Sequence, residues 1–189
     1  RKEYNAGSAQ KVHLVGMDIS LVAANGAIIK QLTDKLHNTR IDSLVAKLVT
    51  CCNYMDAAWA DQNNGGKKYP WKNVVQNCVQ GYETVIALHD VLPGTDRSLQ
   101  TALYNCRLAF YAIYRPVKEK KEAGRDEAMA NMVKRAAEIT PNARVIVWAH
   151  SAHLARKNIF NGGGGVTGAF LNSFFQGNYF VAGTGTAGG

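Results

Sequence analysis

Apolar residues recur every three or four positions along the middle of this chain, which is the spacing of one buried helix face. The first such series comprises Leu44, Leu48, Cys51, Cys52, Met55 and Trp59. The others comprise Val74, Val75, Cys78, Val79, Tyr82 and Ile86, and then Leu103, Leu108 and Tyr111. The pattern predicts at least four amphipathic helices between Ile19 and Gly124.

Three segments rich in turn-forming or charged residues separate these helices. They are residues 63–66 (NNGG), 92–96 (LPGTD) and 118–124 (KEKKEAG). Gly, Pro and Asn favour turns, and either Asp96 or Ser98 can cap the helix after the second break. After the third break, another helix is expected to begin at Arg125-Asp126.

Short apolar runs near the two ends of the chain predict buried parallel strands. The strands are expected near residues 11–18, 144–149 and 179–183, with a short helix at 168–175 between the last two. Strand, helix and strand over this length form a βαβ unit. The expected fold class is therefore α/β, a mostly parallel sheet with a large helical insertion at about residues 20–120, incomplete in this chain.

Composition narrows the function classes. The chain has 189 residues, 47% of them hydrophobic, which is enough for about one domain with a core. No apolar run approaches the roughly 18 residues that a membrane span needs. The net charge of +8 raises nucleic acid, anionic lipid or an acidic substrate as partners. Nucleic acid is not expected, because the basic run at 118–121 is interleaved with glutamates and contains no aromatic that could stack on bases.

All four cysteines lie in predicted helices, and none belongs to a CxxC pair with metal-ligand spacing. Buried free thiols are expected. A single bridge from Cys51 or Cys52 to Cys78 stays open as the alternative, since spacing alone cannot say which helices touch.

His150 and His153 are the strongest candidates for chemistry. They follow the expected strand at 144–149, at the end where open parallel sheets bind ligands. If a helix begins at Ser151, the two imidazoles can face the same way and act as acid, base or hydrogen-bond donor near neutral pH. A structural or solvent-exposed pair and a metal site are the alternatives, although no HExxH motif or Cys partner accompanies them.

Two further residues are candidates for substrate binding. Asp18 ends the first expected strand, and it would face the same ligand-binding crevice as the two histidines if the strands are parallel neighbours. Its alternative role is the N-cap of a following helix. Arg125 offers a planar donor for a substrate carboxylate or carbonyl, while Asp126 stabilises the dipole of the helix that it starts. The run 162–165 (GGGG) lacks the Lys-Ser or Lys-Thr of a nucleotide loop, which leaves a lid edge or a flexible linker.

Several of these motifs together resemble the erythromycin esterase-like family. They are Arg125-Asp126 with Met129-Ala130 and Asn131, the run from Val145 to His153, the segment from Gly168 to Leu171, Gly177-Asn178-Tyr179, and the run from Val12 to Asp18. The Trp148-Ala149-His150 run is the strongest element, and Ser151 stands where the family commonly has Asn.

This resemblance implies hydrolysis of an ester or lactone by water activated through His and Glu, without a covalent serine, a metal or an obligatory cofactor. His150 and His153 would line the pocket, Arg125 would help to fix charge there, and the helical insertion would wall the cleft. The family's upstream catalytic His and Glu have no counterpart in this sequence. The chain is therefore expected to be an interior fragment of one such domain, and enzyme activity is expected if the upstream segment exists.

The competing hypothesis is a catalytically inactive binding or structural protein on the same scaffold. On the enzyme hypothesis the partner is a small ester or lactone, with a macrolide as one option. The sequence gives neither the oligomeric state nor the compartment, although the cytoplasm is slightly favoured.

Overall fold

The computed structural model describes residues 2–7, 16–18, 22–92, 94, 96–119, 124–139, 144–156, 165–176 and 178–181. The helices are α1 (Lys2–Gly7), α2 (Val22–Thr33), α3 (Thr39–Asn63), α4 (Trp71–Val91), α5 (Arg97–Tyr114), α6 (Arg125–Glu138), α7 (Ser151–Leu154) and α8 (Thr167–Phe175). A 3-10 turn (Asp34–Leu36) follows α2, and a π turn (Arg115–Glu119) follows α5. Regular structure in the described ranges is helical throughout, so the expectation of an α/β fold is wrong.

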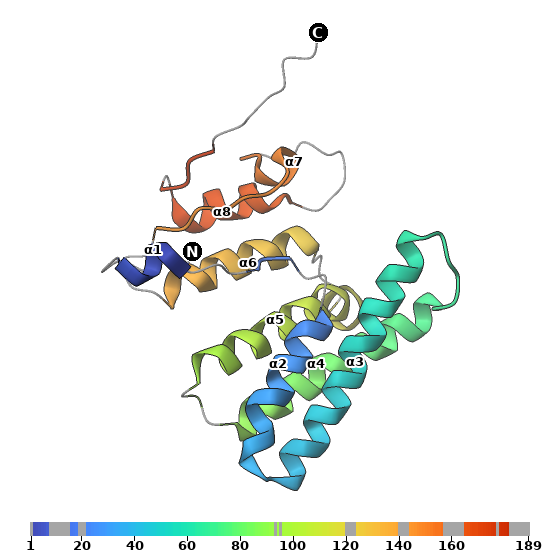
Figure 1. The fold of residues 1–189 in the computed structure, drawn as a ribbon. Helices are drawn as coiled ribbons and strands as arrows, with labels where there is room; N and C mark the ends of the chain where they lie inside the picture. The colour runs from blue at the N-terminus through green and yellow to red at the C-terminus, as the bar shows by residue number, and fades with distance from the viewer. Residues whose placement is uncertain are drawn as a thin grey trace.

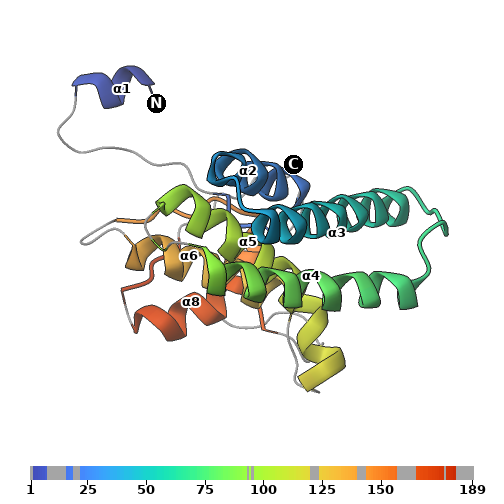
Figure 2. The ribbon, with the colours of Figure 1, turned by 90° about the horizontal axis from the view of Figure 1, so that it is seen from below.

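Helices α2 to α5 form a four-helix bundle (Figure 1), in which α2 and α4 each pack against both α3 and α5. Figure 2 shows α3 and α4 as a long helical hairpin. Among the largest fully buried side chains in this bundle are Ile29, Leu48, Met55, Leu88, Leu103 and Phe110. The helices predicted from apolar spacing are therefore confirmed, and their apolar faces form the main core.

The first two predicted breaks and one of the two candidate caps match the structure. Of the third break, residues 118 and 119 belong to the π turn, and residues 120–123 lie outside the described ranges. Helix α3 ends at Asn63, and Gly65 follows in a left-handed conformation with φ of 74°. Asp96 caps α5 by accepting hydrogen bonds from the amides of Ser98 (2.9 Å) and Leu99 (3.0 Å). Asp96 and not Ser98 is thus the cap, because a short carboxylate just before the helix reaches the first unpaired amides.

Helix α2 is capped by a residue of another helix. The Asp56 carboxylate on α3 accepts hydrogen bonds from the amides of Val22 (2.8 Å) and Ala23 (3.0 Å). These amides have no partner within α2, so the contact satisfies them and ties the start of α2 to the middle of α3.

Helix α6 joins the bundle to a second, smaller apolar cluster. Its Ala128 and Met132 belong to the main core, whereas Ala130 and Val133 pack with Leu171 of α8. The partly buried members of this second cluster are Met17, Val147, Phe170, Phe174, Phe175 and Tyr179. Figure 1 accordingly shows α6 lying between the bundle and α8.

The three expected strands are not present in the described residues. Residues 16–18, 144–150 and 178–181 have no regular secondary structure, and residues 11–15 and 182–183 lie outside the described ranges. Ile146 and Trp148 are 93% and 96% exposed, although Val147 between them packs against the second cluster. Branched apolar residues favour extended backbone, but a strand also needs a hydrogen-bonded neighbour, which their spacing does not specify.

All four cysteines are free and buried, as expected, and the alternative bridge to Cys78 is absent. Burial raises the pKa of Cys51 to about 11 and that of Cys78 to about 12. The thiolate is the reactive form, so these thiols are poor nucleophiles near neutral pH.

Among the described residues, no helix is both long enough and apolar enough to cross a bilayer.

Candidate functional site

The two candidate histidines lie on one short turn of helix. Helix α7 begins at Ser151, which meets the condition for the two imidazoles to share one turn, and His150 is its N-cap. The Nδ1 atom of His150 accepts a hydrogen bond from the amide of Ala152 at 3.2 Å, and the amide of His153 donates to the carbonyl of His150 at 2.9 Å. His150 is exposed and the side chain of His153 is 31% exposed, so small molecules can reach both imidazoles.

His153 is paired with a carboxylate on α6. Its Nδ1 atom lies 2.7 Å from Oδ1 of Asp126. The same Oδ1 accepts hydrogen bonds from the backbone amide of Thr167 (2.9 Å) and from its hydroxyl (2.7 Å). Thr167 is completely buried, so these two donors hold the carboxylate in a fixed position.

Asp126 is placed where a negative charge is stable. It lies in the first turn of α6, and its carboxylate faces the first amide of α8, so it is close to the positive ends of two helix dipoles. Burial raises the pKa of the Asp126 carboxyl, but the hydrogen bonds from Thr167 and His153 lower it more. The net pKa is below the ordinary value, and the group is ionised at neutral pH.

A glycine lets α7 approach α8 closely enough to form this site. A Cβ atom at Gly168 would overlap the carbonyl oxygens of Leu154 and Ala155. The hydroxyl of Tyr179 donates to the Leu154 carbonyl at 3.0 Å, and Arg156 donates to the Tyr179 carbonyl at 2.9 Å. These contacts fix the end of α7, and with it the position of His153.

The two expected substrate-binding residues bind each other. Arg125 donates from Nε to Asp18 Oδ1 at 2.9 Å and from a terminal nitrogen to Asp18 Oδ2 at 2.5 Å. Both side chains are partly exposed, at 52% for Arg125 and 39% for Asp18. Arg125 therefore presents its planar donor edge to Asp18. Asp56 on α3 binds the first two amides of α2, and residues 19–21, between Asp18 and α2, lie outside the described ranges.

The structure thus brings His150, His153 and the Asp18–Arg125 pair to the region where α6, α7 and α8 begin. Asp126 and Thr167 were not predicted as site residues from the sequence. Asp126 stood out only as a helix-starting acid, and a buried threonine at the start of α8 carries no signal of its own. Of the glycine run at 162–165, only Gly165 lies within the described residues.

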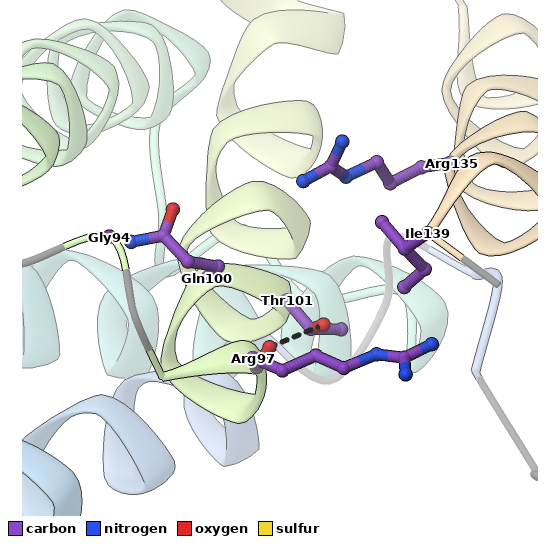
Figure 3. Close-up of a pocket in the computed structure, with 6 residues that line it drawn as sticks. All are labelled: Gly94, Arg97, Gln100, Thr101, Arg135 and Ile139. Carbon is purple, nitrogen blue, oxygen red and sulfur yellow. Dashed lines mark hydrogen bonds between the residues drawn. The ribbon is translucent and has the colours of Figure 1, made fainter.

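A cavity of about 270 Å³ lies elsewhere, between the start of α5 and the end of α6 (Figure 3). Its lining residues are Gly94, Arg97, Gln100, Thr101, Arg135 and Ile139. Arg135 and Ile139 lie toward the C-terminal end of α6, whereas Asp126 lies at its start. At 1.5 Å per residue this separation is roughly 14–20 Å, so the cavity is distinct from the histidine site.

Within the described ranges, no group of three or more His, Cys, Asp or Glu side chains is arranged to hold a metal ion. The histidine site offers one carboxylate and two imidazoles, of which Asp126 and His153 are engaged with each other.

A family model described as erythromycin esterase matches residues 2–189, which is nearly the whole chain. The protein belongs to the erythromycin esterase family. No curated protein and no solved structure matches the chain. Membership confirms the resemblance based on the histidine motif, and at family level it points to a hydrolase-type function with a small macrolide-like substrate.

Family membership gives the histidine pair a chemical context. In this member of the erythromycin esterase family, the motif from Trp148 to His153 forms the turn that carries both imidazoles. Arg125 and Asp126, at the start of α6, bind Asp18 and His153. The described residues of these motifs therefore lie close together where α6, α7 and α8 begin.

Proposed function

We propose that this protein is a metal-independent hydrolase that cleaves a carboxylic ester or lactone by water activated at His150 and His153. The observation that carries the proposal is the pairing of His153 with an ionised Asp126, next to an exposed second histidine on the same turn. A paired imidazole with one accessible ring nitrogen is the usual arrangement of a general acid–base group.

The chemistry needs one proton acceptor and one hydrogen-bond donor at the reacting carbonyl. One imidazole takes a proton from water as the water oxygen attacks the carbonyl carbon. The other donates an N–H to the carbonyl oxygen, which gains negative charge. The first imidazole then returns its proton to the leaving alkoxide, so that ester and water become acid and alcohol.

The Asp18–Arg125 pair has a supporting place in this proposal. Since the guanidinium is already bound by Asp18, we propose that the two residues act as one unit beside the pocket. The opposite charges of Arg125 and Asp18 nearly cancel. The ion pair can therefore orient polar groups of a substrate without competing for the protons of the two histidines.

The test is hydrolysis of a panel of aryl esters, aliphatic esters and macrocyclic lactones by the purified native protein. Mass spectrometry of the products should show addition of one water. Activity should survive exhaustive chelation, because no step uses a metal. Turnover that chelators abolish and Zn²⁺ restores would replace the proposal with a metal-dependent mechanism.

The binding-protein alternative makes a different prediction for the same panel. A scaffold that only binds would retain these compounds, with saturable affinity, but release them unchanged. Binding without any product after prolonged incubation would therefore contradict the hydrolase proposal.

A further inference from the structure

We infer that His150 and His153 are held in opposite neutral tautomers, so that His153 presents a proton-accepting Nε2 and His150 presents a proton-donating Nε2–H. Asp126, Thr167 and the amide of Ala152 are the positioning groups that set these tautomers. The catalytic meaning of this assignment rests on the proposed function, whereas the assignment itself rests on hydrogen-bond partners.

The tautomer of His153 follows from what surrounds Asp126. The amide and hydroxyl of Thr167 both donate to Asp126 Oδ1, so this oxygen is acting as an acceptor. An ionised carboxylate has no proton to give, which makes Nδ1 of His153 the donor across the 2.7 Å contact. A neutral imidazole carries one ring proton, so Nε2 of His153 has a free lone pair.

The tautomer of His150 follows from a backbone amide. The N–H of Ala152 can only donate, and it points at Nδ1 of His150 from 3.2 Å. Nδ1 is therefore the acceptor, and the single proton of the neutral ring must be on Nε2. The Asp126 carboxylate therefore places the ring proton of His153 on Nδ1. The amide of Ala152 places the ring proton of His150 on Nε2.

These tautomers assign the two tasks of the proposed reaction. Nε2 of His153 takes the proton from water, and the positive charge that develops on its ring is stabilised by the Asp126 carboxylate. The Nε2–H of His150 donates to the carbonyl oxygen as that oxygen becomes negative. His153 then gives its proton to the leaving alkoxide and returns to the same neutral tautomer.

Thr167 has a separable part in this arrangement. Thr167 is fully buried. Its hydroxyl donates a hydrogen bond to Asp126 Oδ1 at 2.7 Å, and its backbone amide donates to the same oxygen. Thr167→Val keeps the volume and the amide but removes the hydroxyl, whereas Thr167→Ser keeps the hydroxyl. The two variants therefore distinguish hydrogen bonding to the carboxylate from simple packing at the start of α8.

The experiment is ¹⁵N NMR of the native protein with labelled histidine, at a pH where both rings are neutral. The variants His150→Gln and His153→Gln assign the signals. In the wild type, the protonated nitrogen should be Nδ1 in His153 and Nε2 in His150. Asp126→Asn and Thr167→Val should lower the Nδ1-protonated fraction of His153, Thr167→Ser should preserve it, and His150 should keep its tautomer in all three.

The same tautomer in both histidines, or an Nδ1-protonated fraction of His153 unchanged by Asp126→Asn and Thr167→Val, would overturn the inference. If Asp126→Asn does not fold, the Thr167 pair carries the test alone. Because the spectra need no substrate, opposite tautomers in a protein that hydrolyses no ester would refute the proposed function and leave this inference intact. Ester hydrolysis by a protein whose two histidines have the same tautomer would support the proposed function and refute this inference.

Discussion

At the scale of single residues, Asp126 contributes most to the site, because it contacts both Thr167 at the start of α8 and His153 on α7. The sequence placed Asp126 at a helix start, where an acid is stabilising on any surface helix. Its contacts with α7 and α8 are tertiary contacts, which the spacing of residues along the sequence does not reveal. His150 and His153 were predictable as a pair, but the partners that give each imidazole its role were not.

The lowered pKa of Asp126 predicts a loss of stability in acid. A carboxyl whose pKa is lower in the folded than in the unfolded protein stabilises the fold above its unfolded value of about 3.9, and this contribution is lost as pH falls through the lower folded value. Urea unfolding of the wild type and Asp126→Asn at pH 7 should differ by about 1 kcal/mol, the usual size of a capping contribution. The difference should shrink toward pH 3, and a constant difference would argue against an ionised Asp126.

At the scale of helices, apolar spacing and turn residues were sufficient to predict α3 to α6, and they limited the cap of α5 to Asp96 or Ser98. Two other helix starts were not predictable, because Asp56 caps α2 and Asp126 caps α8 from distant helices. The apolar run at 145–149 predicted a buried strand and forms irregular backbone instead. The shared reason is that local sequence specifies a backbone preference, whereas the partner of each unpaired amide depends on tertiary packing.

Replacing Asp56 with Ala should destabilise the four-helix bundle. The amides of Val22 and Ala23 would lose the acceptors that now lie at 2.8 and 3.0 Å. The expected loss is roughly 0.5–2 kcal/mol in the free energy of unfolding. Asp90→Ala, at an exposed position near the end of α4, is the control and should have little effect. Equal stability of both variants in thermal and urea unfolding would show that Asp56 does not stabilise the start of α2.

Replacing Gly168 with Ala should damage the site more than the bundle. The added methyl group would overlap the carbonyl oxygens at the end of α7 and push that helix, with His153, away from Asp126. Hydrolysis should fall while most of the helical circular dichroism remains. Gly94→Ala, where a Cβ meets nothing within 4 Å, is the matched control. Full activity of Gly168→Ala would show that the close approach of α7 and α8 is not required.

At the scale of the whole molecule, the core and the site belong to different parts of the fold. The expectation that the helical insertion walls the substrate cleft does not hold for the apolar face of α3, since Leu48 and Met55 are completely buried in the bundle. Helix α7, which carries His153, packs against α8 and lies on the side of α6 away from the bundle. Substitutions in the bundle should therefore affect activity through stability, whereas substitutions at the site should affect activity with stability preserved.

The role of His153 as the group that takes a proton from water is tested most directly by kcat/KM for ester hydrolysis. The wild type is compared with His153→Gln, and His89→Gln is the control. His89 is an exposed histidine on α4, outside the site. Gln keeps some hydrogen bonding but cannot transfer a proton, and a positioned acid–base group is worth about 10²- to 10⁴-fold in rate. We expect a fall of at least about 10²-fold for His153→Gln with unchanged circular dichroism, and no change for His89→Gln. A folded His153→Gln variant with a wild-type rate would contradict this role of His153.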